Sequence, residues 1–265
     1  MKRLLLLSAL AILAGCRETP PSGGNTGTGT PAPRPETTAA TPTATATATA
    51  TSSAAPGATG TASAAATAAA AGPTRTWSFD KDKADGAPAG FDLVSTGGKA
   101  GKWLVKAESV APTAPNVLAQ LDTDKAEGRV TAAIAGDSAA KDARVAVRCK
   151  LVSGKVDQSC GVVVRYKDEK NYYLARVNGL EKDVNLYVVK DGKRTSLGGW
   201  KGATIGEAWH EIRVDAKGDH LELYWDGTRV FEANDKSFPD AGRAGVWVRA
   251  DSVTYFDELA VTPLG

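Results

Sequence analysis

Residues 208–233 read AWHEIRVDAKGDHLELYWDGTRVFEA and contain three short runs in which apolar and polar side chains alternate. In the first run Ile212 and Val214 fall on one side and charged residues on the other, the period of a half-buried β-strand. Lys217-Gly218 and Asp226-Gly227 separate the runs, and the second pair suits a type I′ turn, whose two central residues need positive φ. The stretch therefore predicts three consecutive antiparallel strands.

The same pattern extends over residues 75–265. Strand-forming runs recur every eight to twelve residues or so, with turn residues such as Asp191-Gly192 between them, which is typical of an all-β sandwich or barrel. Fourteen strands are too many for one flat sheet, so we expect two packed antiparallel sheets. No long helix is expected, and only residues 138–144 have a pattern compatible with one helical turn. The expected strands are 76–80, 102–107, 116–122, 128–134, 143–152, 160–166, 171–178, 183–190, 193–198, 208–216, 219–225, 228–233, 243–250 and 253–262.

The first 74 residues lack the side chains of a folded core. All aromatic residues lie at or after Trp77, and 52 of the 57 residues from Arg17 to Pro73 are Ala, Thr, Pro, Gly or Ser. Such a segment cannot bury enough apolar surface to offset the entropy of ordering. Residues 16–74 are therefore expected to be a disordered linker, and residues 75–265 the one folded domain.

Residues 1–16, MKRLLLLSALAILAGC, have the order of a secretory signal: positive charge, an apolar run and small residues. The ten residues from Leu4 to Leu13 would cover only ~15 Å as a helix, half of a ~30 Å hydrocarbon core. The ending Leu13-Ala-Gly-Cys16 resembles the lipobox of bacterial lipoproteins. The resemblance implies that the signal peptide, residues 1–15, is removed and that Cys16 is acylated, for example with palmitate.

The expected location is the bacterial cell envelope, with an extracytoplasmic domain held to the membrane only through this lipid. Arg17 follows the cysteine in place of the Asp that resembles an inner-membrane retention signal, which favours the outer membrane. The alternative is an ordinary secretory signal that happens to contain Cys16.

The charge balance disfavours a nucleic-acid partner. The formal net charge is +2, and without Lys2 and Arg3 the chain has 30 basic and 30 acidic side chains. Binding to a phosphate backbone depends on clustered positive charge.

Cys149 and Cys160 remain after lipidation, one at the end of an expected strand and the other at the start of the next. Because an exported protein meets oxidising conditions, we predict a disulfide between them. A redox or metal-binding pair is the alternative, but no further ligand lies nearby in the sequence.

Several blocks together resemble concanavalin A-like lectin/glucanase domains, most closely laminin G-like and 3-keto-disaccharide hydrolase-like bacterial modules. The resemblance spans residues 76–262 and implies a jelly roll of two antiparallel sheets, one of them concave, with sugar bound on the concave face. Such folds serve lectins, hydrolases and adhesion modules alike, so the likeness says little about function. The blocks are Gly161–Tyr166 (GVVVRY), Asn171–Asn178 (NYYLARVN), Trp209–Val214 (WHEIRV), Tyr224–Thr228 (YWDGT), Gly245–Val248 (GVWV) and Tyr255–Leu259 (YFDEL).

No catalytic residues are predicted. The Glu-x-Asp-x-x-Glu motif of the glucanases, which would supply the paired carboxylates of retaining hydrolysis, is absent from the sequence. Asp168-Glu169 lies in an expected turn, where a solvated pair is the ordinary interpretation. His210 shares a face with Ile212 and is expected to be a packed histidine.

A binding face has better support, because strand alternation gathers flat rings, guanidinium groups and amides of the kind that recognise sugars. The alternative is a solvated sheet face with arginines for solubility and aromatic rings for cross-strand packing. The candidate ligand-binding residues are Arg165, Arg176, Asn178, Asn185, Tyr187, Trp247 and Arg249.

The fold resemblance also implies a structural calcium ion where the first and last strands meet. Asp80 and Asp82 follow the first strand and Asp257 lies in the last, and such hard oxygen ligands suit calcium. The alternative is a solvated acidic loop interleaved with Lys81 and Lys83.

Together these observations favour a lipid-anchored β-sandwich that binds carbohydrate or a cell-envelope polymer without catalysis. Two alternatives stay open: a glycoside hydrolase of the 3-keto-disaccharide type, and a protein–protein adhesion or assembly module.

Overall fold

The computed structural model describes residues 72–265, so Cys16, the signal peptide and nearly all of the linker lie outside the described residues. Those described form fifteen strands and no helix, and consequently no helix that could cross a membrane. The strands are β1 (Arg75–Trp77), β2 (Phe91–Thr96), β3 (Trp103–Ala107), β4 (Asn116–Gln120), β5 (Val130–Ala135), β6 (Ala143–Ser153), β7 (Ser159–Asp168), β8 (Asn171–Asn178), β9 (Asp183–Lys190), β10 (Lys193–Lys201), β11 (His210–Lys217), β12 (His220–Trp225), β13 (Thr228–Asn234), β14 (Arg243–Arg249) and β15 (Val253–Pro263).

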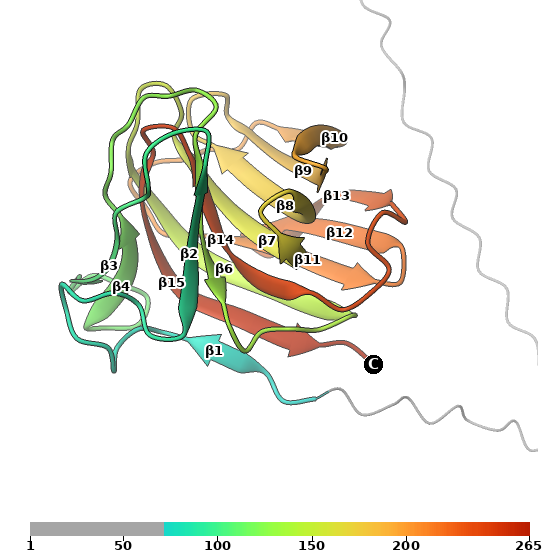
Figure 1. Cartoon of the computed structure of the whole chain (residues 1–265), viewed down its shortest axis with the longest axis horizontal. Helices are drawn as coiled ribbons and strands as arrows, with labels where there is room; N and C mark the ends of the chain where they lie inside the picture. The colour runs from blue at the N-terminus through green and yellow to red at the C-terminus, as the bar shows by residue number, and fades with distance from the viewer. Residues whose placement is uncertain (1–71) are drawn as a thin grey trace, which may run out of the picture. The chain divides into compact units, whose positions relative to one another are not determined.

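The strands pair into two antiparallel sheets that face each other across the core (Figure 1). One sheet has the order β13-β12-β11-β6-β15-β4-β3, with β1 also paired to β15. The other has the order β10-β9-β8-β7-β14-β5-β2. The predicted all-β sandwich of two antiparallel sheets is confirmed.

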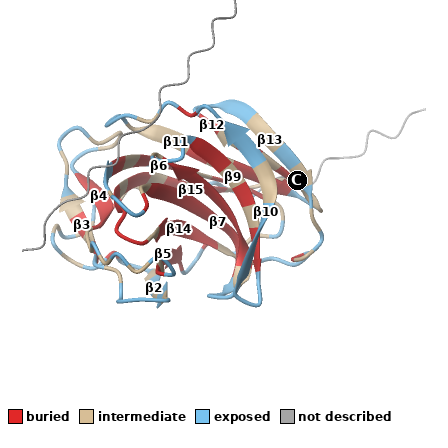
Figure 2. Cartoon of the chain, turned by 90° about the horizontal axis from the view of Figure 1, so that it is seen from above, coloured by how far each residue is buried: buried red, intermediate tan, exposed pale blue. Residues whose placement is uncertain are grey.

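The seven-stranded sheet is strongly curved (Figure 2). The face that it turns away from the eight-stranded sheet is concave, with β2 and β10 at its two edges. Apolar side chains from both inner faces fill the space between the sheets. A second, smaller apolar cluster lies on the concave face itself, and it includes Tyr172, Leu174 and Trp247.

Turn chemistry fixes the hairpins as the sequence predicts. Asp191 and Gly192, and likewise Asp226 and Gly227, all have positive φ, between 46° and 78°, as a type I′ turn requires. Every one of the fourteen predicted strands overlaps an observed strand. The possible helical turn at residues 138–144 does not form, because Ser138 is hydrogen-bonded to Ala135 and Ala244 in an irregular connection.

The sequence analysis missed one strand, β2. Asp92 and Leu93 are both exposed in this edge strand, so it lacks the alternation that identifies a half-buried strand. β2 forms a strand because its backbone pairs with β5, which its own sequence pattern does not predict.

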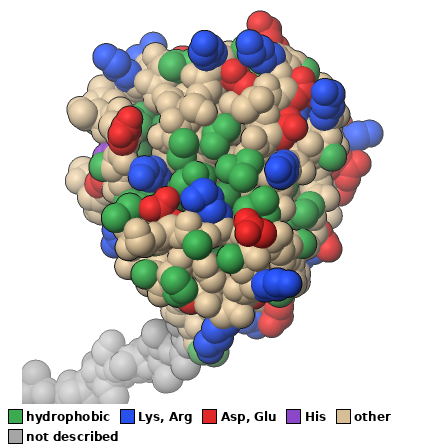
Figure 3. Space-filling model, turned by 90° about the vertical axis from the view of Figure 1, so that its left-hand side faces the viewer, with side chains coloured by type: hydrophobic (Ala, Val, Ile, Leu, Met, Phe, Trp, Pro, Cys, Tyr) green, Lys and Arg blue, Asp and Glu red, His purple; other side chains and the backbone are tan. Residues whose placement is uncertain are grey.

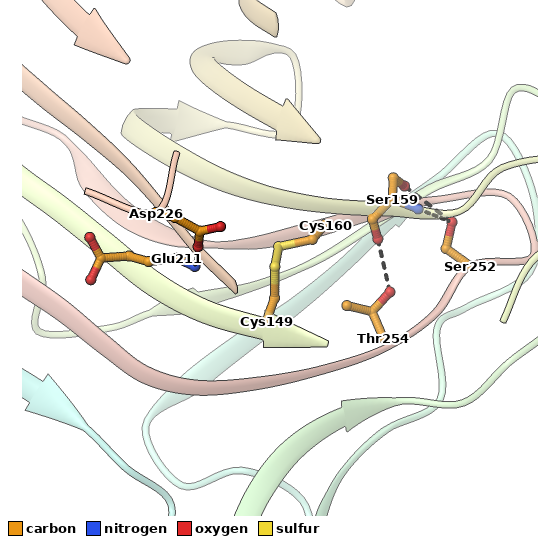
Figure 4. The surroundings of a disulfide bond; sticks show 7 residues. All are labelled: Cys149, Ser159, Cys160, Glu211, Asp226, Ser252 and Thr254. Carbon is orange, nitrogen blue, oxygen red and sulfur yellow. Dashed lines mark hydrogen bonds between the residues drawn. A yellow bond between two sulfur atoms is a disulfide. The ribbon is translucent and has the colours of Figure 1, made fainter. Parts of the chain in front are cut away.

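The connection from β6 to β7 passes from one sheet to the other, and a disulfide and hydrogen bonds hold its two ends in place (Figure 4). The predicted disulfide between Cys149 and Cys160 is present, with both cysteines buried in the core. Beside it the Ser159 amide donates to Ser252 Oγ over 3.0 Å, and Thr254 Oγ1 donates to the Ser159 carbonyl over 2.8 Å. These contacts join β7 to β15 of the opposite sheet.

Removing the disulfide should lower stability without changing the fold. A bridge between residues 11 apart in sequence is worth ~3 kcal/mol in the chain-entropy model. At ~2–4 °C per kcal/mol for a domain of this size, we expect Cys149→Ala/Cys160→Ala to melt roughly 6–12 °C below wild type in a thermal scan under oxidising conditions. Added reductant should leave the double variant unchanged. Equal melting temperatures for variant and wild type would show that the bridge does not contribute.

Candidate functional site

The concave face of the seven-stranded sheet holds a groove of about 310 Å³. Trp247 of β14 is buried at its base and packs over Gly161 of neighbouring β7, which has no side chain. A Cβ at Gly161 would lie 3.1 Å from Trp247 Cε3 and 2.9 Å from Leu174 Cδ1. The lining residues are Thr96, Glu127, Gly128, Val130, Glu169, Lys170, Tyr172, Val189, Gly192, Arg194, Trp247 and Arg249.

Arginine side chains stack on aromatic rings around this base. The Arg194 guanidinium lies 4.9 Å from the centre of the Tyr187 ring and 6.0 Å from that of Trp247. The Arg176 guanidinium lies 5.8 Å from the same Tyr187 ring. Cation–π contacts of this kind hold both rings and guanidinium groups in fixed orientations.

A group of carboxylates surrounds Arg176 next to the groove. Arg176 lies within 3.5 Å of Asp157 and Asp183 and is hydrogen-bonded to Glu181. Asp157 also lies 3.4 Å from Nη1 of Arg249. Asp157 and Arg176 are almost completely buried, so each depends on the other for compensation of its charge.

Asp251 positions Asp157 from the adjoining turn. Its carboxylate accepts hydrogen bonds of 2.9–3.1 Å from the amides of Lys155, Val156 and Asp157, which fixes the β6–β7 loop. Burial opposes the charge of Asp251, but these amide donors hold its pKa below the usual 3.8.

The pKa shifts of the groove residues follow from burial and from neighbouring charges. Burial raises the pKa of Asp157 despite the attraction of Arg176, and burial raises the pKa of Tyr172. Burial works against the charge of Arg176, yet Tyr187 and Asp157 raise its pKa above the ordinary value. The pKa of Arg194 is lowered by partial burial and by the like charge of Arg176.

The structure brings together most of the residues predicted for a concave binding face. Arg176, Tyr187, Trp247 and Arg249 all belong to the network around the groove. Asn185 lies beside Arg176 in the β8–β9 register. Their proximity is a matter of geometry, and whether they bind a ligand stays a prediction.

One of the predicted residues, Arg165, lies elsewhere. Arg165 has φ of +51° at an irregularity in β7, and its side chain is buried against the Lys141 and Phe238 carbonyls and Asp142. Simple alternation misplaced Arg165 because the irregularity shifts the register.

Asn178 is buried at the edge of the network. Its Oδ1 accepts from the amides of Leu180 and Glu181 in the β8–β9 turn, and its Nδ2 donates to Asp157 over 3.5 Å.

Sequence reasoning missed Arg194 and Tyr172. The signal for Arg194 was available, because the Asp191-Gly192 turn fixes Arg194 opposite Val189 and therefore on the same face as Tyr187. Tyr172 could not be assigned to either face from its NYY context. The partners of Arg176, namely Asp157, Glu181 and Asp183, come from loops and strand ends whose positions alternation does not predict.

The predicted calcium ligands do not form one group among residues 72–265. Asp80 accepts from the Asn116 amide, Asp82 from the Ala89 amide, and buried Asp257 from Thr113. In the same range the only three metal-type side chains that come close together are His220, Glu222 and Glu232. Arg229 already donates to both of those carboxylates, over 2.6 and 2.7 Å, and so competes with any ion for them.

His210 is a packed residue, as the sequence indicates. Its ring stacks on Trp225 with centroids 4.9 Å apart, and Nδ1 lies 2.8 Å from Asp226. Figure 3 shows one side of the molecule, where hydrophobic side chains gather centrally and acidic and basic side chains are interspersed around them. That face therefore shows no uniformly basic surface.

Comparison with solved structures identifies the architecture. The carbohydrate-binding module CBM66 from Bacillus subtilis matches with a TM-score of 0.51 and 19% sequence identity, over 67% of this chain and 98% of that one. This chain has the β-sandwich fold of that module.

Two further structures match the sandwich at lower TM-scores. One is a protein of unknown function with a galectin-like fold from Bacillus subtilis, with a TM-score of 0.47 and 7% identity over 66% of this chain and 91% of that one. The other is domain 4 of AbnA, an extracellular arabinanase from Geobacillus stearothermophilus, with a TM-score of 0.46 and 13% identity over 71% and 91%. No protein-family model and no curated protein matches the chain.

Asp251→Asn should destabilise the sandwich in a pH-dependent way. Hydrogen bonds to a charged group are worth ~1.5–3 kcal/mol, so we expect a melting temperature lower by roughly 5 °C or more at neutral pH. The folded pKa of Asp251 lies below its unfolded value of 3.8. The stabilisation is therefore present above pH 3.8 and is lost as the pH falls through the folded pKa.

Melting curves from pH 7 to pH 2.5 measure this effect. The gap between wild type and variant should be constant down to about pH 4 and close below it. Asp240→Asn is the control, because Asp240 is exposed and its side chain makes no hydrogen bond or ion pair with another described residue. A gap of the same size at pH 2.5 as at pH 7 would contradict the role of the ionised carboxylate.

Proposed function

We propose that this protein is a lipid-anchored, non-catalytic module of the bacterial cell envelope that binds carbohydrate in the concave groove. The observation that carries the proposal is the groove on the concave face, where the exposed Arg194 guanidinium lies over the half-buried Tyr187 ring and above Trp247. A sugar ring offers an apolar face to an aromatic ring and hydroxyl oxygens to guanidinium donors. Tyr187 and Arg194 provide both side by side.

The fold comparison supports the same assignment. The match with the highest TM-score reported above is a carbohydrate-binding module, and that structure covers the same two-sheet architecture. A fold alone does not determine a ligand, so the assignment to this chain depends on the groove and its side chains.

The state of the carboxylates supports binding without hydrolysis. Asp157 and Asp183, both buried, are engaged by Arg176, and Glu181 is hydrogen-bonded to the same guanidinium. Glu127 and Glu169, which line the groove, are exposed. A general acid works in a site protected from water, and these exposed groups lack that environment.

The point where the chain enters the sandwich is compatible with an anchor. β1 pairs with β15, and Thr74 is hydrogen-bonded to Thr262, in the eight-stranded sheet. The linker therefore joins the sheet opposite the groove. In the proposed arrangement Cys16 holds the lipid at the outer membrane, and residues 16–74 separate the domain from it.

Retention on polysaccharides tests the binding proposal. The chain carrying Cys16→Ala is purified and mixed with insoluble and soluble polysaccharides, including peptidoglycan, and the supernatant is assayed for released sugar. Retention without release supports the proposal. Release would establish a glycoside hydrolase, and no retention on any polymer would favour a protein partner.

Tyr187→Ala should weaken retention because it removes the ring beneath both Arg176 and Arg194. Loss of one such ring, worth ~0.5–1.5 kcal/mol, predicts about two- to twelvefold weaker binding. Trp200→Ala is the matched control. Trp200 is an exposed aromatic residue of the same sheet, but it pairs with Val184, which points into the core, so Trp200 lies on the face opposite the groove. Equal losses in the two variants would contradict the assignment of the groove.

The anchor has a separate test. Expressed in a bacterium with labelled palmitate, the wild-type chain should incorporate label and fractionate with the outer membrane, and Cys16→Ala should do neither. Label that persists in Cys16→Ala would overturn the lipid anchor without affecting the groove.

A further inference from the structure

Arg194 differs from every other arginine in residues 72–265. The other ten each have a carboxylate oxygen within 4.0 Å, and Arg194 has none. Its guanidinium lies over the Tyr187 and Trp247 rings instead and makes no hydrogen bond within the described chain. Arg194 is also exposed, so its guanidinium, which has no carboxylate partner in residues 72–265, is open to a ligand.

A second cation lines the same groove. Lys170 is exposed, and its Nζ has no carboxylate oxygen within 4.0 Å among the described residues. Two positive side chains, Arg194 and Lys170, are therefore open to a ligand without a carboxylate partner in the described part of the chain.

The neighbouring charges show why the ligand group at Arg194 should be an anion. Arg176 has its own three carboxylates and Arg249 has Asp157, so neither needs another. Arg194 experiences the like charge of Arg176, which contributes to lowering the pKa of Arg194. A negative group placed at Arg194 would offset that repulsion.

Resting on the proposed function, we propose that the groove selects acidic glycans, in which a sugar carboxylate accepts hydrogen bonds from the Arg194 guanidinium, with the charge of Lys170 in the same lining. A planar carboxylate matches the paired donors of a guanidinium, which a hydroxyl does not. Exposed Glu127 and Glu169 disfavour an anion in their part of the lining, so the charged group is expected at Arg194.

Matched polymers test the selectivity. Polygalacturonate, alginate, hyaluronan and peptidoglycan are each compared with the same polymer after methyl esterification of its carboxyl groups, using the full chain with Cys16→Ala. We expect at least one acidic polymer to bind, and its ester to bind at least tenfold more weakly. Added salt should weaken the acidic polymer more than the ester, because salt screens the charge pair.

Variants assign the effect to Arg194. Arg194→Gln should remove most of the preference for the acidic polymer and leave binding of the ester unchanged. Arg194→Lys should retain part of the preference. Lys170→Gln should lose a smaller part of it, with melting curves to confirm folding. Arg229→Gln is the matched control, an arginine of the other sheet that is paired with Glu222 and Glu232.

The outcomes separate this inference from the function on which it rests. Retention of neutral polymers with no preference for acidic ones would overturn the inference and leave carbohydrate binding standing. A preference that is unchanged in Arg194→Gln would also overturn it. Failure of every acidic and neutral polymer to bind would overturn both.

Discussion

The passage of the chain from one sheet to the other between Cys149 and Cys160 is the constraint on which the rest of the molecule depends. The disulfide holds β6 of one sheet against β7 of the other within the core. The same short connection carries Asp157, whose amide is held by Asp251. A covalent link at the centre of the sandwich thus also fixes the charged residue that organises the concave face.

Asp157 in turn fixes the arginine side chains of the concave face. Its carboxylate lies between Arg176 and Arg249, so the guanidinium groups of β8 and β14 are held from one buried point. Removing one partner of a buried pair leaves the other uncompensated, at a cost of several kcal/mol, ~3–5. The groove is therefore pre-organised, and a ligand need not supply the free energy to order it.

How much the sequence predicts depends on whether a feature is local. Alternation and the Asp-Gly turns are local, and they locate fourteen of the strands and the side of each strand on which Tyr187 and Trp247 lie. The prediction for Arg165 was wrong and β2 was missed, for different reasons. An irregularity in β7 turns the side chain of Arg165 to the other face, and β2 forms a strand because it pairs with β5, not because of its own sequence pattern. The carboxylates around Arg176 arrive from loops, and only the folded chain brings them together.

The pairing of charges bears on how the groove can recognise a ligand. Acidic and basic groups balance over the chain, and ten of the eleven described arginines are paired, so long-range attraction of a charged polymer is weak. Selection must come from contact at Arg194 and the rings beside it. A single contact of that kind binds weakly, but a polymer repeats its sugars, and in the proposed membrane-tethered arrangement many copies of the domain face one strand. Linked weak contacts exceed the affinity of any one of them by ~10²–10⁴. In that arrangement a groove with few unpaired cations is sufficient to hold a polymer firmly.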